Sequence, residues 1–471
     1  MTAKTYEEWK QNALRADARS GADRWKLEEH SHTYDYRVIR LRYDELVEIR
    51  ASGDMHGLLY YLNEGIHGNM GGMGAPSLYT RTEIGTKKLI EDYIKEVVAA
   101  LDQLASASDA EISHQEKLAL FKRSSVCFGC SAMMLSGAGP LGPFHIGVVK
   151  SLWEQNLLPD IISGASAGAV IAAIAGTRHN SHVSDIFVGS KLADLVQLMT
   201  DTAGLIQTQA PISAAHLMDL IEALIPDMTF VEALEESGRY INIAVAPAQM
   251  QQRSRLLNAM TSPNACIREA ILASCAIPGV FPAVTLQAKD GKGQRKPYVP
   301  SRKWVDGSIS TDLPAKRLSR QYNVNHFISS QANPLVVWGL QDPGSASDPW
   351  SQYMSIYQSA TRAWMRAIYP LTMSMMPNAH PANVNTRMLF DVLTQEYTAD
   401  ITMMPKRRNF MFAEMMLPPS THETFALVRE GERSTWPKIE QIRNCTSISR
   451  KLDAVLTNLD QNFKPYARSV A

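Results

Sequence analysis

Ser166 is the residue whose setting most clearly suggests chemistry, because it lies between two glycines in the pattern G-x-S-x-G. A serine in this pattern stands at the apex of a sharp turn from a strand into a helix, where its hydroxyl is exposed as a nucleophile. The glycines, Gly164 and Gly168, are needed because the turn brings their backbones close together. A strand-like run, "DII", comes before the motif, and a helix-like run, "AVIAAIAG", follows it. We therefore interpret Ser166 as a nucleophile at such a turn.

A glycine-rich segment, "LSGAGPLGPFHIG", lies one strand-helix unit before Ser166. Gly137, Gly139 and Gly142 have the spacing G-x-G-x-x-G, and Pro143 is well placed to begin a helix. Such a loop can hold a dinucleotide pyrophosphate, with Asp160 where a ribose-binding carboxylate would stand, or it can direct backbone N–H groups at an oxyanion. A third interpretation is a turn that only lets the strand and helix pack. The serine motif downstream favours the oxyanion loop, because a dinucleotide-binding fold has no need for it.

A nucleophilic hydroxyl requires a proton acceptor. Asp306 has a distinctive setting, because it ends the apolar run "KWVD" and precedes Gly307, which permits a sharp turn. An ionised aspartate within hydrogen-bonding reach accepts a serine proton directly. By itself, an Asp-Gly pair is also typical of an ordinary turn. Histidines that could complete a Ser, acid, His order have no distinctive setting; they are His179, His182, His326, His380 and His422.

The overall composition excludes some classes of function. The 471 residues include 47 Lys and Arg and 47 Asp and Glu, so the formal net charge is zero and we expect no nucleic acid partner. Five cysteines and the lack of a signal-peptide pattern in the first residues predict a reducing, cytoplasmic environment. The longest apolar stretch, 161–176, is shorter than the roughly 20 residues that span a bilayer. We therefore expect no transmembrane segment and only peripheral contact with membranes.

The pattern of the sequence changes twice along the chain. Residues 1–125 predict a helical domain, interrupted at 67–77 by the glycine-rich "HGNMGGMGAPS", which we expect to be a loop, with a binding role as the alternative. Residues 126–340 alternate short apolar runs with helical stretches and predict an α/β core with a mostly parallel sheet. Residues 341–471 predict a helical extension packed on that core. The predicted strands are 132–136, 160–163, 240–247, 303–307 and 325–332.

Together these motifs resemble the patatin-like phospholipases, acyl hydrolases that work through a Ser-Asp dyad. The glycine-rich loop, the serine motif and the Asp-Gly pair occur in the expected order, and "AIPGVFP" follows at 276–282. The match is closest to a branch of triacylglycerol lipases that carry a helical N-terminal domain of unassigned function, on segments such as "LNEGIHGNMGGMGAPSLYTR" and "GERSTWPKI". The resemblance covers most of the chain and implies a three-layer α/β core with a mostly parallel central sheet, preceded by a helical domain.

The resemblance also implies roles for individual residues. Ser166 is implied as the nucleophile, and Asp306, followed by the turn at Gly307, as the proton acceptor. The N–H groups implied to line the oxyanion hole belong to the glycine-rich loop and to the residue after the serine: Gly137, Ala138, Gly139, Gly142 and Ala167.

Three positions depart from the family pattern. Ala138 replaces the middle glycine of a usual triple-glycine loop, Leu141 stands where a basic residue is common, and Ser308 follows Asp-Gly in place of glycine or alanine. An alanine N–H still donates unless a positive φ is required. Loss of the basic residue removes a contact to a phosphate head group and favours a neutral ester.

We therefore expect a serine acyl hydrolase that cleaves fatty acyl esters of glycerolipids, either triacylglycerol or phospholipid. It would act through an acyl-enzyme at a membrane or lipid-droplet surface, without a metal ion or another cofactor. Three alternatives stay open: a phospholipase A or lysophospholipase, a lipid acyltransferase, and a catalytically silent scaffold on a lipid surface. The head group, the chain length and the oligomeric state stay open as well.

Several other features favour ordinary structural roles. Cys127 and Cys130 form a single C-x-x-C without a partner pair, which argues against a zinc site. His145, in the first turn after the glycine-rich loop, is interpreted as a residue that packs or braces the loop. The methionines of "LTMSMMP", "ITMMP" and "FMFAEMM" are expected to fill a core, with the lining of an acyl-chain site as the alternative.

Overall fold

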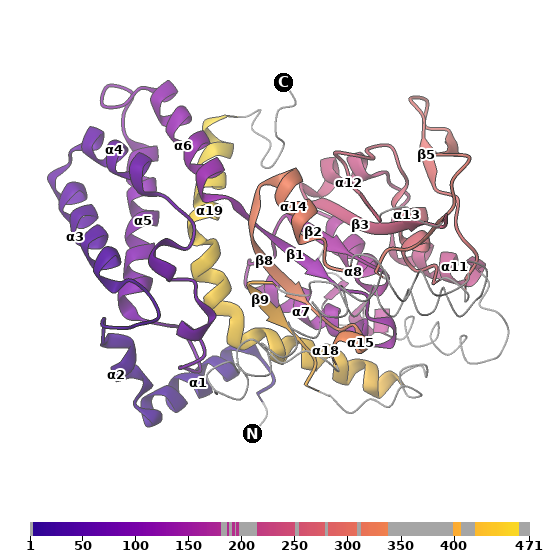
Figure 1. The fold of residues 1–471 in the computed structure, drawn as a ribbon, viewed down its shortest axis with the longest axis horizontal. Coiled ribbons are helices and arrows are strands. Elements are labelled where there is room, and N and C mark those ends of the chain that lie inside the picture. The colour runs from indigo at the N-terminus through magenta and orange to yellow at the C-terminus, as the bar shows by residue number, and fades with distance from the viewer. Residues whose placement is uncertain are drawn as a thin grey trace, which may run out of the picture. The chain divides into compact units, whose positions relative to one another are not determined.

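The chain divides into two units, each built from segments that are distant in the sequence (Figure 1). The first unit comprises 1–131, 316–327 and 436–471, and the second comprises 132–315 and 328–435. The computed structural model describes residues 3–179, 186–187, 191–193, 195–196, 214–249, 254–277, 281–308, 312–337, 399–406 and 420–460.

The first unit is helical, as its N-terminal sequence predicts. Local signals define where its helices begin and end: the Thr5 side chain accepts the N–H of Glu8, and Ser113 with Glu116 forms a capping box. Gly21 ends the first helix in the left-handed conformation. The helices are α1 (Tyr6–Ser20), α2 (Ala22–Leu27), α3 (Tyr36–Ser52), α4 (Met55–Gly65), α5 (Lys88–Ser106), α6 (His114–Phe128), α14 (Ala315–Tyr322) and α19 (Ile439–Leu459), with the short η6 (Trp436–Lys438).

Helix α5 supplies much of the core of this unit. One stripe of the helix is buried at helical spacing, including Ile90, Ile94, Val97 and Leu101. The C-terminal helix α19 packs against α5 and α6 and adds its own buried side chains, such as Leu452, to the same core (Figure 1). Burial of each large aliphatic side chain contributes about 1.5–3 kcal/mol, so a helix near the C-terminus helps to stabilise the helical unit.

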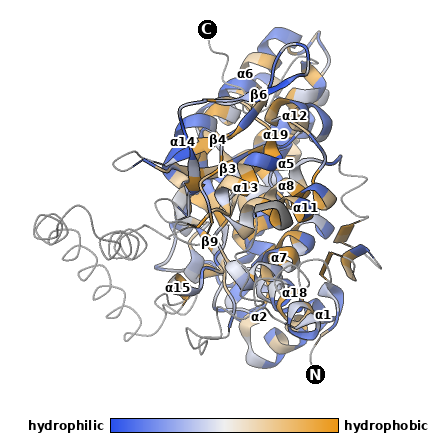
Figure 2. Cartoon of the chain, turned by 90° about the vertical axis from the view of Figure 1, so that its right-hand side faces the viewer, coloured by the Kyte–Doolittle hydropathy of each residue, from blue (hydrophilic) through white to orange (hydrophobic). Residues whose placement is uncertain are grey.

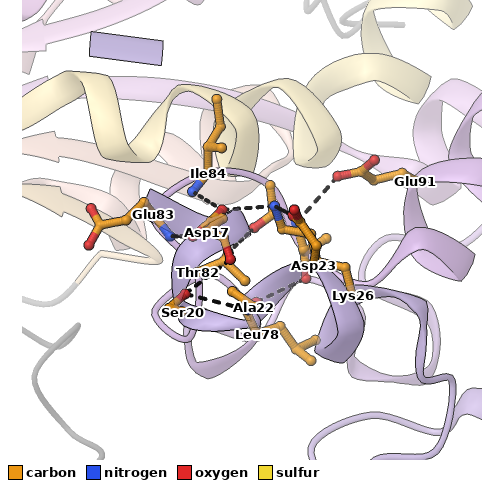
Figure 3. A network of polar contacts seen from close by, with 12 residues as sticks. Asp17, Ser20, Ala22, Asp23, Lys26, Leu78, Thr82, Glu83, Ile84 and Glu91 are labelled. Carbon is orange, nitrogen blue, oxygen red and sulfur yellow. Dashed lines mark hydrogen bonds and ion pairs between the residues drawn. The ribbon is translucent and has the colours of Figure 1, made fainter. Parts of the chain in front are cut away.

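The expected loop at 67–77 connects α4 and α5 and contains two short turns, η1 (Met70–Gly72) and η2 (Pro76–Leu78). The chain that follows it is held by Asp17 of α1 (Figure 3). The buried Asp17 carboxylate accepts the N–H groups of Glu83 at 2.8 Å and Ile84 at 3.3 Å, and it pairs with the Lys26 ammonium at 2.8 Å. These charge-assisted hydrogen bonds anchor the entry to α5 on α1.

A seven-stranded sheet, most of whose residues belong to the second unit, has the order β4-β3-β2-β1-β8-β9, with β7 paired to β3. The pairs β1/β2, β2/β3 and β8/β9 are parallel, and β3/β4 and β3/β7 are antiparallel. This mostly parallel sheet confirms the predicted α/β class. The strands are β1 (Cys130–Leu135), β2 (Ile161–Gly164), β3 (Tyr240–Pro247), β4 (Arg255–Leu257), β7 (Trp304–Asp306), β8 (Val324–Ser330) and β9 (Ile401–Met403); β5 (Gln287–Lys289) and β6 (Arg295–Pro297) form a separate hairpin.

Helices cover the strands, which explains why the strands are apolar almost throughout. Every residue of β2 is buried, as expected for a strand between two helical layers. Helices α8 and α13 pack against β3, and α7 packs against α18. Figure 2 shows the hydrophobic colouring of these central elements. The helices of this unit are α7 (Pro143–Glu154), α8 (Ala167–Gly176), α11 (Ala214–Leu224), α12 (Phe230–Ser237), α13 (Ile267–Ser274), α15 (Pro334–Val337) and α18 (Thr421–Thr435), with the short η3 (Gly139–Leu141).

Two strands of the sheet were not predicted. Both β4 and β9 have three residues, which is too short for an alternating pattern to be recognised. Strand β9 lies beyond residue 340, so the sheet draws on a segment that we expected to be a helical extension. Within that segment, 341–471, α18 belongs to the α/β unit and α19 to the helical unit. The boundaries of the three domains predicted from the sequence remain a prediction.

Of the three methionine-rich segments, only "ITMMP" is described by the structure, and its Met403 is fully buried in β9. The other two, 371–377 and 410–416, lie outside the described residues. Within the described ranges, no helix has the length and apolar character that crossing a bilayer demands.

Helices α7 and α18 approach each other closely at two glycines. A Cβ atom on Gly147 would lie 1.9 Å from the carbonyl oxygen of Val428, and one on Gly431 would lie 2.2 Å from the carbonyl oxygen of Phe144. Both obstacles are backbone atoms, which cannot move away as a flexible side chain could. The contact therefore requires a glycine on each helix.

Gly147→Ala and Gly431→Ala are each expected to destabilise the protein by about 1–3 kcal/mol, because the added methyl group must push the two helices apart. This cost exceeds the gain in helix propensity of about 1 kcal/mol. Thermal denaturation measures the effect as a lower Tm. Gly291→Ala is the matched control, since a Cβ there meets nothing within 4 Å. Unchanged Tm values for both helix variants would contradict this account of the contact.

Candidate active site

Ser166 lies at the sharp turn between β2 and α8, where it is the N-cap residue of α8. Its backbone has φ 51° and ψ −123°, in a region that residues other than glycine rarely adopt. Such a conformation costs about 1–3 kcal/mol and persists only where the surrounding structure enforces it. The strand, turn and helix are therefore arranged as the motif predicts.

The two flanking glycines allow this turn. A Cβ on Gly164 would lie 2.3 Å from the carbonyl oxygen of Gly168, and one on Gly168 would lie 2.5 Å from the carbonyl oxygens of Leu135 and Ser136. The N–H of Ala165 donates to the Leu135 carbonyl at 3.2 Å. The first turn of α8 is thus pressed against the end of β1, which leads into the glycine-rich loop.

Ser274 ties this turn to the rest of the unit. The N–H of Ser166 donates to Ser274 Oγ at 2.9 Å, and that hydroxyl donates to the Ala244 carbonyl at 2.7 Å. Ser274 is the last residue of α13 and is fully buried, whereas Ala244 belongs to β3. Ser274 was not predicted as a site residue, because "ILASCAIPG" contains no spacing that distinguishes it.

Asp306 is the last residue of β7 and lies opposite Val245 of β3. Its N–H donates to the Ala276 carbonyl at 2.9 Å, which joins the Asp-Gly turn to the start of the "AIPGVFP" segment. Gly307 passes so close to Ala244 that a Cβ would lie 2.4 Å from its carbonyl carbon. The Asp-Gly turn therefore packs against Ala244 through Gly307. The Ser166 turn is linked to the same Ala244 through Ser274.

The environment of Asp306 makes its carboxyl group an unusually good proton acceptor. Burial raises the pKa of Asp306 from 3.8 to about 6. Hydrogen bonding to the backbone and side chain of Ser308, and to the side chain of Ser166, opposes this rise. The Ser308 N–H lies 2.8 Å from Asp306 Oδ1. The side chain that neighbours Ser166 is thus a carboxyl group that is largely ionised at neutral pH.

Cys275 adds a thiol beside the same two side chains. Burial, and then the negative charge of Asp306, raise the pKa of the Cys275 thiol to about 12, while hydrogen bonding with Ser166 lowers it. The thiol therefore stays protonated and uncharged at neutral pH.

The glycine-rich loop runs from β1 through η3 to α7, and two of its N–H groups are already engaged. The Gly137 N–H donates to Asp312 Oδ1 at 2.6 Å, and the Gly142 N–H donates to the Gly139 carbonyl at 3.1 Å. This differs from the expectation that both would line an oxyanion hole. Asp312, the acceptor for Gly137, was not predicted as a site residue.

The other expected donors are placed differently. Among the described residues, none accepts a hydrogen bond from the N–H of Ala138, Gly139 or Ala167. Gly139 has φ 49°, which favours glycine, whereas Ala138 has φ −136°, which any residue adopts. Alanine in place of the middle glycine therefore leaves the backbone unstrained.

His145 braces the loop. Its Nε2 lies 3.0 Å from the Ser136 carbonyl, which only accepts, so Nε2 carries the proton and Nδ1 accepts from Ser330 Oγ at 2.7 Å. Burial lowers the pKa of His145 to about 4, so the ring is neutral at physiological pH. The interpretation of His145 as a bracing residue is confirmed.

The remaining histidines lie elsewhere. His326 Nδ1 is 2.8 Å from Ser131 Oγ within the first unit, and His179 and His422 are exposed. His182 and His380 lie outside the described residues.

Cys127 is exposed, and the buried Cys130 donates to the Tyr322 carbonyl at 3.3 Å. In the part of the chain that the structure describes, no three His, Cys, Asp or Glu side chains are grouped to hold a metal ion.

Comparison with known proteins identifies two families and several relatives. The family "Patatin-like phospholipase" matches residues 133–318, and "Domain of unknown function (DUF3336)" matches residues 1–126. "Triacylglycerol lipase 4" of Saccharomyces cerevisiae is 33% identical over 97% of this chain and 52% of its own length. "Triacylglycerol lipase ptl3" of Schizosaccharomyces pombe is 31% identical over 98% of this chain and 97% of its own length. "Triacylglycerol lipase SDP1L" of Arabidopsis thaliana is 31% identical over 97% and 58%.

The chain thus spans about half the length of the Saccharomyces and Arabidopsis proteins, and nearly the whole length of the Schizosaccharomyces protein.

The raised pKa of Asp306 predicts how the reactivity of Ser166 depends on pH. Protonated Asp306 cannot accept the serine proton, so the rate of labelling by a fluorophosphonate should fall as pH falls through about 6. Ser308→Ala removes a hydroxyl that favours the ionised carboxylate, and it should shift this midpoint to higher pH.

Ser237→Ala serves as the control, because its hydroxyl donates to the carbonyls of Gly176 and Ala233 at the far end of α8. The control should leave the midpoint unchanged. A midpoint near 4, the ordinary range of an aspartate, would refute the assignment of Asp306 as the acceptor.

Proposed function

Because this chain belongs to the patatin-like phospholipase family, we propose that it is a serine acyl hydrolase that cleaves fatty acyl esters of glycerolipids, with triacylglycerol as its main substrate. One observation carries the proposal: Ser166 stands at a strained turn beside the buried carboxyl group of Asp306. The relatives are named triacylglycerol lipases, which supports the substrate class.

The proposed first step forms an acyl-enzyme. Asp306 accepts the proton of Ser166 Oγ as that oxygen attacks the ester carbonyl carbon. The resulting oxyanion accepts hydrogen bonds from backbone N–H groups, for which we propose Ala138, Gly139 and Ala167. When the intermediate collapses, the bond to the leaving alcohol breaks and Asp306 returns the proton to that oxygen.

The second step releases the fatty acid. Water replaces the alcohol, gives a proton to Asp306 and attacks the acyl carbonyl carbon through a second oxyanion. Collapse of that intermediate breaks the bond to Ser166 Oγ, which recovers its proton from Asp306. In comparable sites, removal of one preorganised donor to the oxyanion lowers kcat by about 10²–10³-fold. The loop is therefore expected to contribute to the rate as well as the dyad.

The surroundings of the loop support a neutral ester over a phospholipid. Leu141, where a basic residue is common in the family, is a buried apolar residue of η3. A phosphate head group would find no cation at this position, whereas the glycerol of a neutral lipid requires none. We propose that the enzyme meets its substrate as a peripheral protein at a lipid-droplet or membrane surface in the cytoplasm.

Ser166→Ala and Asp306→Asn test the dyad directly. Each is expected to lower the rate of fatty acid release from a triacylglycerol emulsion by at least about 1,000-fold, because the first lacks the attacking oxygen and the second lacks the proton-accepting carboxylate. Activity within about threefold of the parent in either variant would rule the dyad out. His326→Ala should retain activity, and a comparable loss there would indicate a triad.

A mixture of labelled triacylglycerol and phospholipid tests the substrate. The proposal predicts mainly diacylglycerol and free fatty acid. Mainly lysophospholipid would favour a phospholipase A, and acyl transfer to an added lipid alcohol would favour an acyltransferase. If an active-site probe failed to label Ser166 and no ester was hydrolysed, a non-catalytic scaffold would be the better account.

A further inference from the structure

Gly137, the first glycine of the loop, is enclosed by the segment that follows the proposed base. Its N–H donates to Asp312 Oδ1 at 2.6 Å. A Cβ on Gly137 would lie 3.0 Å from Ser308 Cβ and 3.5 Å from Asp312 Oδ1. Since Ser308 also donates to Asp306, the base and the loop are held by one stretch of chain.

Asp312 also joins the loop to β8. Its second oxygen accepts a hydrogen bond from Asn333 Nδ2 at 3.2 Å, and the Asn333 N–H donates to Gln331 Oε1 at 2.9 Å. These residues follow the C-terminal end of β8, as Gly137 follows that of β1. Asp312 therefore links the chain segments that leave β1, β7 and β8.

A carboxyl group in this position is energetically unfavourable unless its hydrogen bonds compensate. Asp312 is only 1% exposed. Burial, with a further contribution from the charge of Asp306, raises the pKa of Asp312 to about 7, and hydrogen bonding from Gly137 and Asn333 lowers it. The hydrogen bond from the Gly137 N–H thus stabilises the ionised carboxylate of Asp312, and the carboxylate in turn holds the loop in place.

We propose that Asp312 is a positioning residue for the oxyanion loop. By accepting the Gly137 N–H, it fixes the peptide that precedes Ala138 and Gly139, so that their N–H groups face the oxyanion of the acyl transfer steps. This inference rests on the proposed function. The Ser166 side chain is hydrogen-bonded to Asp306, whereas Asp312 is hydrogen-bonded to the loop. Asp312 therefore acts through the loop and is not a second base.

The role predicts a specific pattern of kinetic effects. Without the Asp312 carboxylate as acceptor, the loop would shift away from the position in which its N–H groups face the oxyanion. A displacement of about 1 Å lowers the rate by on the order of 100-fold. The oxyanion exists only during the reaction, so kcat should fall while KM stays nearly constant. A fluorophosphonate, whose phosphoryl oxygen occupies the same site, should react more slowly in parallel.

Three substitutions separate hydrogen bonding from packing and charge. Asp312→Ala removes the acceptor, and Asp312→Leu removes it while filling the space that an alanine would leave empty, so that the pair separates the loss of the hydrogen bond from the loss of packing. Asp312→Asn keeps an oxygen for the Gly137 N–H, and Asn333 can rotate its own amide to accept from the new one. We expect losses of about 100-fold in kcat and in labelling rate for the first two, and less than about fivefold for Asp312→Asn.

Asn242→Leu is the matched control, because Asn242 is a buried polar residue of β3 that is hydrogen-bonded to Asn258 at 2.8 Å. It should lower Tm without changing kcat by more than about threefold. The inference is wrong if the folded Asp312→Leu variant keeps kcat within about threefold of the parent, if KM rises in place of the fall in kcat, or if folded Asp312→Asn loses as much as Asp312→Leu.

Parent enzyme and Ser166→Ala, assayed alongside, separate this inference from the proposed function. If the parent hydrolyses no ester, or if Ser166→Ala remains active, the proposed function fails. If the parent is active, Ser166→Ala is inactive and Asp312→Leu resembles the parent, only the role of Asp312 fails.

Discussion

The backbone at Ser166 can turn as sharply as it does because two glycines let the end of β2, the start of α8 and the end of β1 approach to contact distance. The turn holds Ser166 at a positive φ, an unfavourable conformation that its neighbours must enforce. Ser274 does so through the Ser166 N–H and the Ala244 carbonyl, and Gly307 packs against the same Ala244. The serine turn and the Asp-Gly turn therefore share one support, the middle of β3.

The electrostatics of the site follow from burial. The described residues around Ser166 include two buried carboxyl groups, Asp306 and Asp312, and the charge of one disfavours ionisation of the other. Their negative charges are balanced mainly by hydrogen-bond donors, the Ser308 N–H for one and the Gly137 N–H for the other. His145 stays neutral and braces the loop through the Ser136 carbonyl. Such a site favours a mechanism in which a carboxylate accepts the proton and fixed backbone dipoles stabilise the oxyanion.

What could be predicted from the sequence depended on how local the signal was. The turn at Ser166 and the strand before Asp306 are encoded within a few residues, and the structure has both. Ser274 and Asp312 could not be found, because their importance comes from contacts with residues more than a hundred positions away. The engaged Gly137 N–H was missed for the same reason, and β9 because three residues carry no periodic signal. The position of α19 in the helical core depends on tertiary packing, which helical periodicity does not specify.

The central claim is that Ser166 carries the acyl group during turnover, with Asp306 as its proton acceptor. Rapid acid quenching during hydrolysis of a slowly turned-over ester, followed by peptide mass spectrometry, tests this claim most directly. The account predicts a mass increase of one acyl group on the peptide that contains Ser166, and its absence in Asp306→Asn. An acyl group on another residue such as Ser274 or Cys275, or undiminished acylation of Ser166 in Asp306→Asn, would contradict it.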